Sequence, residues 1–215
     1  MSKKQIAYDS IKEKILNCEY KPNSFLNEDL LCEDFGVSRT PVRDALGRLE
    51  QEHLVTILPK KGFLVAPLTV NEINMVFEGR LLLEPYILTN YCKNLSSEDL
   101  NHMNSIISLY KKAIQDQKND VYNYDIEFHK CIVNQCTNRY LLRTYNDIEN
   151  QDRRIRILSG DSNEERLFET VNEHKQILDC LRKNDVTNAS LLLISHLQQS
   201  KESAFQFYMN GQGSF

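Results

Sequence analysis

Residues 37–51, VSRTPVRDALGRLEQ, decide the fold of the first third of this chain. Ser38 is a suitable helix N-cap, and Pro41 is tolerated because it falls in the first turn, where backbone N–H groups have no intrahelical partner. Apolar side chains recur at the i, i+3, i+4, i+7 spacing of a helix face that packs on a domain: Val42, Ala45, Leu46 and Leu49. Arg39, Arg43 and Gly47 share another face. The stretch therefore predicts a helix with one buried face and one arginine face.

The arginine face of this helix is suited to read DNA. The major groove admits a helix, and the fork of an arginine matches guanine O6 and N7, so Arg39 and Arg43 near the helix N-terminus suit base contacts. Ser38 and Thr40 are placed to contact phosphate oxygens. The alternative is an ordinary amphipathic helix with solvated arginines, because arginine is common on exposed faces.

The residues on either side complete a winged helix-turn-helix. We expect one helix over residues 8–16 and another over residues 27–35, which ends at Gly36. Residues 55–58 and 63–65 are expected to form two strands joined by the sequence PKKG. Lys60, Lys61 and Gly62 at this tip would form a basic wing that contacts the DNA backbone or minor groove. The wing favours the DNA-reading interpretation of the preceding helix.

Composition limits the class of protein. With 215 residues, 41% of them hydrophobic, the chain can build packed cores. Its net charge of −4 gives no general attraction to polyanions, so contact with nucleic acid must come from a local basic cluster. No apolar run is long enough for a membrane span or signal peptide, and the six cysteines lack paired spacing. We therefore expect a cytoplasmic protein with reduced thiols and no membrane partner.

Turn-forming residues divide the chain near residue 68. Most prolines and glycines fall in the first third, and the remainder reads as long helices. We expect a mainly α protein, with a winged helix-turn-helix DNA-binding domain over residues 1–67 and an all-α antiparallel helical bundle over residues 68–215.

Four residues of the expected bundle are candidates for a metal site. Asp125 and His129 are four residues apart, so on a helix both can reach one ion. His174 and His196 fall in later helices, each among aliphatic residues. An acidic residue four positions before a histidine is common by chance, and for either later histidine alone the alternative is a hydrogen-bonded core residue.

These motifs resemble the GntR-type winged-helix regulators, in particular the FadR-type branch with an FCD effector domain. The resemblance rests on Leu26-x-Glu28, GVSRTPVRDAL over residues 36–46, RLE over residues 48–50, Leu54-Val55, and PKKG over residues 59–62. It implies that Ser38, Arg39 and Arg43 contact operator DNA, a double-stranded partner, with Thr40 as a weaker fourth contact.

The sequence departs from the family pattern at three positions. Asn23 and His53 stand where the family usually has glycine, and both residues tolerate left-handed turns better than most. Asp29 stands where many members have arginine, which removes an expected DNA contact. Operator preference or affinity is therefore expected to differ from that of relatives.

The resemblance also covers the bundle. The metal-binding FCD subgroup uses an Asp-x-x-x-His pair and one histidine from each of two later helices, a pattern matched by Asp125, His129, His174 and His196. Three imidazoles and one carboxylate suit a divalent ion such as zinc, nickel or manganese. Arg80 matches a family position that often faces the effector, where it would bind the carboxylate of a small organic acid. The alternative role for Arg80 is an ion pair with Glu84.

Together these features predict a homodimeric DNA-binding transcription regulator. Operator binding would be modulated by a small organic acid bound at the metal site in a C-terminal domain that also dimerises. One alternative is a metal-dependent enzyme acting on a small organic acid, because such a site can support hydrolysis or oxygen chemistry. Another is a winged helix used for protein contact.

Overall fold

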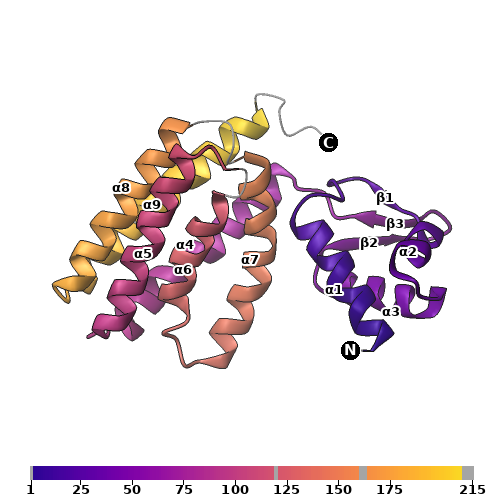
Figure 1. Ribbon diagram of the computed structural model, residues 1–215, viewed down its shortest axis with the longest axis horizontal. Helices are drawn as coiled ribbons and strands as arrows, with labels where there is room; N and C mark the ends of the chain where they lie inside the picture. The colour runs from indigo at the N-terminus through magenta and orange to yellow at the C-terminus, as the bar shows by residue number, and fades with distance from the viewer. Residues whose placement is uncertain (1, 119–120, 160–163, 210–215) are drawn as a thin grey trace. The chain divides into compact units, whose positions relative to one another are not determined.

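The computed structural model describes residues 2–118, 121–159 and 164–209, and the chain divides after Thr69 into two compact units (Figure 1). The sequence placed this boundary after residue 67. Within the described residues, no helix combines the length and the apolar character that a membrane crossing needs.

The N-terminal unit combines three helices with a small sheet: α1 (Lys3–Leu16), β1 (Phe25–Leu26), α2 (Glu28–Phe35), α3 (Arg39–Gln51), β2 (Val55–Leu58) and β3 (Gly62–Val65). The strands are antiparallel in the order β1-β3-β2, and Val55 pairs with Val65 across the expected hairpin. The helix expected from residue 8 begins earlier, at Lys3. Strand β1 was not expected, because two residues are too few to show an alternating pattern.

Local capping explains where α2 begins and ends. The side chain of Asn27 accepts hydrogen bonds from the backbone N–H groups of Asp29 and Leu30, at 2.8 and 3.3 Å. Gly36 ends the helix in the left-handed region, at φ 62°. Asn23 and His53 also have positive φ angles, of 62° and 58°, as their places in the family pattern implied.

The buried face expected for α3 is confirmed. Its apolar side chains are at most 1% exposed: Val42, Ala45, Leu46 and Leu49. They pack with the apolar faces of α1 and α2 and with β2, so the opposite side of α3 is left to solvent. Burial of one face thus fixes which way the arginines of α3 point.

The C-terminal unit is a bundle of long helices, as expected: α4 (Val70–Tyr91), α5 (Ser97–Gln115), α6 (Tyr122–Val133), α7 (Arg139–Ser159), α8 (Glu164–Arg182) and α9 (Val186–Met209). Helix α4 packs on α9, α7 and α6, and α8 packs on α9 and α5. Its interior is apolar except for buried polar side chains that include Arg80, Glu84, Asp125, His129, Asp152, His174 and His196. The mainly α fold is therefore confirmed, and the polar site lies inside the bundle.

Candidate functional site

A hollow of about 440 Å³ on the N-terminal unit collects most of the residues expected to contact DNA. Those that line it come from α3 and the wing: Arg39, Arg43, Lys61 and Gly62. The others are exposed but do not line it: Ser38, Thr40 and Lys60. Ser38 takes the N-cap position of α3 without a side-chain capping bond. The fold thus brings the helix and the wing, distant in sequence, to one surface.

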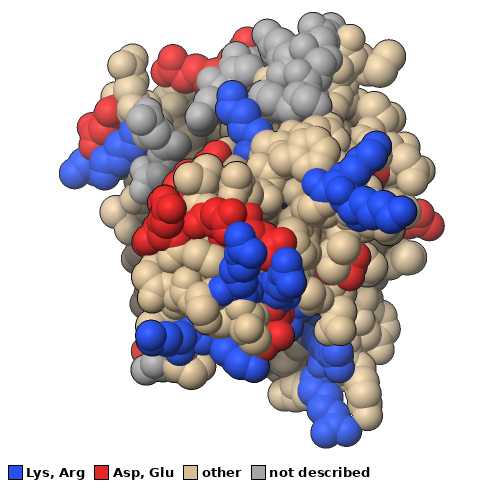
Figure 2. All heavy atoms as spheres, turned by 90° about the vertical axis from the view of Figure 1, so that its right-hand side faces the viewer, with Lys and Arg blue, Asp and Glu red and all other residues tan. Residues whose placement is uncertain are grey.

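Both arginines of this hollow are paired with carboxylates of α2. Arg39 contacts Asp29 Oδ1 through Nε at 3.0 Å and Nη2 at 2.8 Å. Arg43 binds Glu28 through two nitrogens, at 2.6 and 3.3 Å. Figure 2, which views the side where α2 and β1 lie in Figure 1, shows acidic side chains directly beside basic ones. These pairs were not foreseen, because they join helices whose crossing the sequence does not specify.

Inside the bundle, the four expected metal ligands come together. Asp125 and His129 lie on α6, His174 on α8 and His196 on α9, all at most 3% exposed. One potential ligand atom of each lies within 4.8 Å of the others. Phe128 stacks on the His174 ring with centroids 3.9 Å apart, which orients that imidazole. The arrangement has the residues and the spacing of a metal site.

Two carboxylates behind the histidines set the orientation of the rings. His129 Nδ1 lies 2.6 Å from Glu84 Oε2, and His196 Nδ1 lies 2.6 Å from Glu173 Oε2. These contacts suit the tautomer with a proton on Nδ1, in which a neutral ring carries the lone pair on Nε2. The two Nε2 atoms face each other at 3.1 Å.

Burial favours the neutral form of two histidines of the cluster, His174 and His196. It lowers the pKa of His196 to about 3, against the opposing hydrogen bond to Glu173, and it lowers the pKa of His174 well below its usual value. Burial alone would raise the pKa of Glu173, but hydrogen bonds from His196 and Arg166 lower it to about 2. His174 and His196 are therefore neutral imidazoles, and the carboxylate of Glu173 behind His196 is ionised.

Several buried atoms of the cluster have no hydrogen-bond partner among the described residues. They are both carboxylate oxygens of Asp125 and both ring nitrogens of His174, although Asp125 Oδ2 is in ionic contact with Arg156. His174 Nε2 lies 3.2 Å from Asp125 Oδ1, but this contact lacks hydrogen-bond geometry. Unsatisfied buried polar atoms are costly, and a bound cation would satisfy Asp125 Oδ1 and one of the two ring nitrogens of His174. The donor set therefore fits a divalent metal ion.

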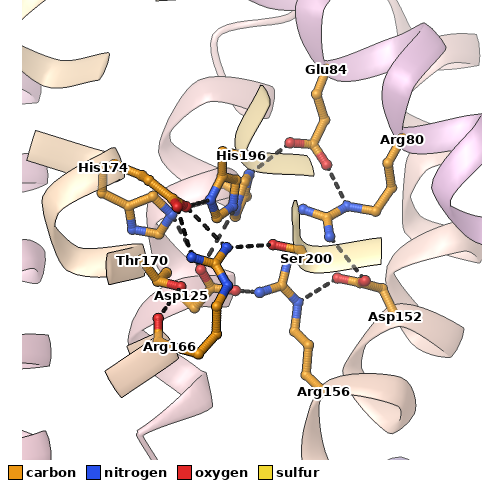
Figure 3. A network of polar contacts seen from close by, with 12 residues as sticks. Arg80, Glu84, Asp125, Asp152, Arg156, Arg166, Thr170, His174, His196 and Ser200 are labelled. Carbon is orange, nitrogen blue, oxygen red and sulfur yellow. Dashed lines mark hydrogen bonds and ion pairs between the residues drawn. The ribbon is translucent and has the colours of Figure 1, made fainter. Parts of the chain in front are cut away.

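Arg80 lies to one side of the cluster, in a chain of ion pairs with Glu84, Asp152 and Arg156 (Figure 3). Its Nε contacts Glu84 at 2.6 Å and its Nη1 contacts Asp152 at 2.9 Å. Asp152 also pairs with Arg156 at 2.6 Å, and Arg156 contacts Asp125. The ion pair between Arg80 and Glu84, which the sequence left as an alternative, is present.

A second cavity, of about 270 Å³, adjoins the cluster at Asp125. Its polar lining includes Arg156, Arg166 and Ser200, and its apolar lining includes Phe77, Tyr110, Leu167 and Phe207. Arg80 is not among the described residues that line it. Arg166 binds Glu173 through both Nη atoms, at 2.6 and 3.0 Å, which joins this cavity to the carboxylate behind His196.

Sequence reasoning named Glu84 only as a partner of Arg80, and it missed three other groups that support and border the cluster: Asp152, Arg166 and Glu173. Glu84 had a local signal, because it lies four residues after Arg80 on one helix. The others had none, since acidic and basic residues on a helix are usually solvated.

Comparison with known proteins agrees with this architecture. Residues 3–65 match the model of bacterial regulatory proteins of the gntR family, and residues 75–199 match the FCD domain. The transcriptional regulator YdhC of Bacillus subtilis is 26% identical over 199 residues, which cover 91% of this chain and 88% of that protein. The gluconate operon transcriptional repressor of Bacillus licheniformis is 26% identical, over 79% of this chain and 68% of the relative.

Solved structures share the fold. A GntR transcriptional regulator from Rhodococcus sp. RHA1 has a TM-score of 0.83 at 18% identity, covering 96% of this chain and 99% of the other. McbR/YncC of E. coli has a TM-score of 0.81 at 21% identity, covering 97% and 99%. The metal-free FCD domain of TM0439 has a TM-score of 0.58 at 21% identity over 67% of this chain and 99% of that domain.

The matched families and relatives are transcription regulators, which favours a DNA-binding regulator over a metal-dependent enzyme. The FCD match alone covers more than half of the chain. This chain therefore belongs to the GntR family of bacterial transcription regulators and carries an FCD domain.

Proposed function

We propose that this regulator binds operator DNA through α3 and the wing, and that a small organic acid bound at a metal ion in the bundle modulates this binding. The observation that carries the proposal is the pair of Nε2 atoms of His129 and His196, 3.1 Å apart. Both rings direct Nδ1 toward a carboxylate, and with the proton on Nδ1 each neutral ring would turn the lone pair of Nε2 toward the other ring. A cation near both Nε2 atoms would be coordinated by both lone pairs.

The proposed ion is a borderline divalent metal such as zinc, nickel or manganese. Asp125, His129, His174 and His196 would hold it, since three imidazoles and one carboxylate match the preference of these ions. A bound ion of this kind supplies a Lewis acid that attracts a carboxylate oxygen. Glu84 and Glu173 would orient two of the imidazoles.

The proposed effector site is the cavity of about 270 Å³ beside Asp125. Arg156 lines it, and its Nη2 is buried without a hydrogen-bond partner among the described residues, so an effector carboxylate could accept from it. We favour Arg156 over Arg80 as the effector contact, because Arg80 lies outside the cavity lining and is held by Glu84 and Asp152. The name of one relative concerns the gluconate operon, which is consistent with an organic acid.

We further propose a homodimer, because two winged helices suit the two halves of a pseudo-palindromic operator. Helix α4 exposes one stripe of large apolar side chains, Met75, Leu82 and Tyr86, which are 49%, 68% and 51% exposed. We assign this stripe to contact with a second copy of the chain. Effector binding would favour one arrangement of the bundle and, through residues 66–68, change the spacing of the two winged helices.

The dimer is tested by the mass of the protein in solution. Light scattering should give twice the chain mass for the native protein and a lower mass for Leu82→Asp, whereas Leu109→Asp, at a 50% exposed position on α5, should stay dimeric. A native monomer would rule out the dimer. A Leu82→Asp protein that remains fully dimeric would rule out the stripe as its interface.

DNA binding is tested by gel shift at moderate salt, with a duplex selected by the protein from random sequence. Arg39→Ala and Arg43→Ala should each weaken binding at least about fivefold, since a good arginine–guanine contact contributes about 1–3 kcal/mol. Arg139→Ala, an exposed arginine of α7, is the control. Native-like binding by both α3 variants would contradict the proposed interface.

The metal site is tested by elemental analysis of the purified protein. His174→Ala and His196→Ala should lose bound metal, whereas His102→Ala, an exposed histidine of α5, should retain it. Candidate organic acids should raise the melting temperature of the metal-loaded protein but not of the two site variants. A native protein that binds no divalent metal would refute the site, and turnover of an organic acid would favour the enzyme interpretation.

A further inference from the structure

The arginines that line the hollow between α3 and the wing are occupied by the protein's own carboxylates. Asp29 is the more open of the two acidic residues, with 64% of its side chain exposed, against 23% for Glu28. Arg39, its partner, is 65% exposed. Both residues line the hollow, so a duplex seated there would meet the ion pair itself rather than a free arginine.

The contact uses the part of Arg39 that would otherwise bind DNA. Nε and Nη2 form one edge of the guanidinium, and both lie within 3.0 Å of Asp29 Oδ1. Such an edge presents two parallel donors, which is the geometry that pairs with guanine or with a phosphate. Asp29 therefore competes with DNA acceptors for the same N–H groups.

Asp29 also acts on DNA directly through its negative charge. Asp29 lies in the first turn of α2, where the helix dipole stabilises its negative charge. A carboxylate on a surface that faces phosphates also repels them, and a duplex carries one charge for roughly every 1.7 Å of its axis. Asp29 thus both withholds a donor and opposes the approach of DNA.

We propose that Asp29 is an affinity-determining residue, which lowers DNA affinity by acting as an internal competitor for the guanidinium of Arg39. The inference rests on the proposed role of Arg39 in DNA binding. Arg39 must leave Asp29 before it contacts an operator. The free energy of this ion pair is therefore subtracted from the free energy of DNA binding. Exposed ion pairs change an equilibrium constant by up to about fivefold, which sets the size of the effect.

The test compares the native protein with Asp29→Asn, which keeps the side-chain shape and removes the charge. Fluorescence anisotropy with the selected duplex should show binding about three- to fivefold tighter. The control is Asp34→Asn, which makes the same charge change at another exposed position of α2. Its affinity should stay within about 1.5-fold of native. Equal gains by both variants would show a general charge effect and overturn the proposal.

A double-mutant cycle identifies the path of the effect. If Asp29 acts mainly through Arg39, Asp29→Asn should tighten binding about three- to fivefold in the native background. In an Arg39→Ala background only the repulsion of phosphates remains to be relieved, so the gain should fall to about 1.5-fold or less. An undiminished gain without Arg39, or unchanged or weaker binding by Asp29→Asn alone, would overturn the inference. Native-like binding by Arg39→Ala would instead refute the proposed DNA contact, so the two failures are distinguishable.

Discussion

Replacing Glu173 by glutamine should weaken metal binding although Glu173 is not a proposed ligand. Glu173 Oε2 lies 2.6 Å from His196 Nδ1, and the carboxylate is ionised because hydrogen bonds from His196 and Arg166 lower its pKa to about 2 despite burial. The negative charge holds the Nδ1 proton of the imidazole and raises the basicity of Nε2. Glutamine keeps the size of the side chain and removes that charge.

The expected loss follows from the strength of this contact. Removing the partner of a metal-bound histidine typically costs about 10- to 100-fold in metal affinity, or about 1.4–2.8 kcal/mol. Because the glutamine carbonyl can still accept from Nδ1, we expect about tenfold for Glu173→Gln and a loss nearer 100-fold for Glu173→Ala.

The assay is a competition titration of Zn²⁺ against a chromophoric chelator at pH 7, with circular dichroism as a check on folding. Glu169→Gln is the matched control, because Glu169 lies on the same helix and contacts the same arginine at 3.5 Å. No described contact links it to a histidine of the cluster. If folded Glu173→Gln and Glu169→Gln both bind Zn²⁺ as tightly as the native protein, this account of the carboxylate is wrong.

Three further outcomes are expected in unfolding experiments. Leu46→Ala truncates a fully buried residue of α3, so it should lower the free energy of unfolding of the N-terminal unit, measured in urea, by about 2–5 kcal/mol. The control Leu30→Ala, at a 57% exposed position, should change this free energy by less than about 0.5 kcal/mol. Arg80→Ala should destabilise the bundle by about 3–5 kcal/mol because Glu84 and Asp152 lose their buried partner; an unchanged urea midpoint would count against this. Removing metal with a chelator should lower the melting temperature of the bundle, and Zn²⁺ should restore it; an indifferent melting curve would contradict a bound ion.

The sequence alone predicted the features that depend on local spacing. The buried face of α3, the left-handed end of α2 at Gly36 and the hairpin follow from residues close together in the chain, where helix and strand periodicity act directly. The grouping of Asp125, His129, His174 and His196 came from the family pattern, and the fold brings these residues within reach of one another.

Only the tertiary structure decided which charged groups meet. Glu173 and His196 are 23 residues apart, and Glu84 and His129 are 45 apart, so their pairing depends on how α4, α6, α8 and α9 pack. The same holds for the pair of Asp29 and Arg39. From the sequence, Arg39 was expected to contact DNA and Asp29 to lack the DNA contact that relatives make there, but their contact with each other was not predicted. From sequence alone a charged residue is expected to be solvated. Its partner depends on how two helices cross, and neighbouring residues in the sequence do not specify that crossing.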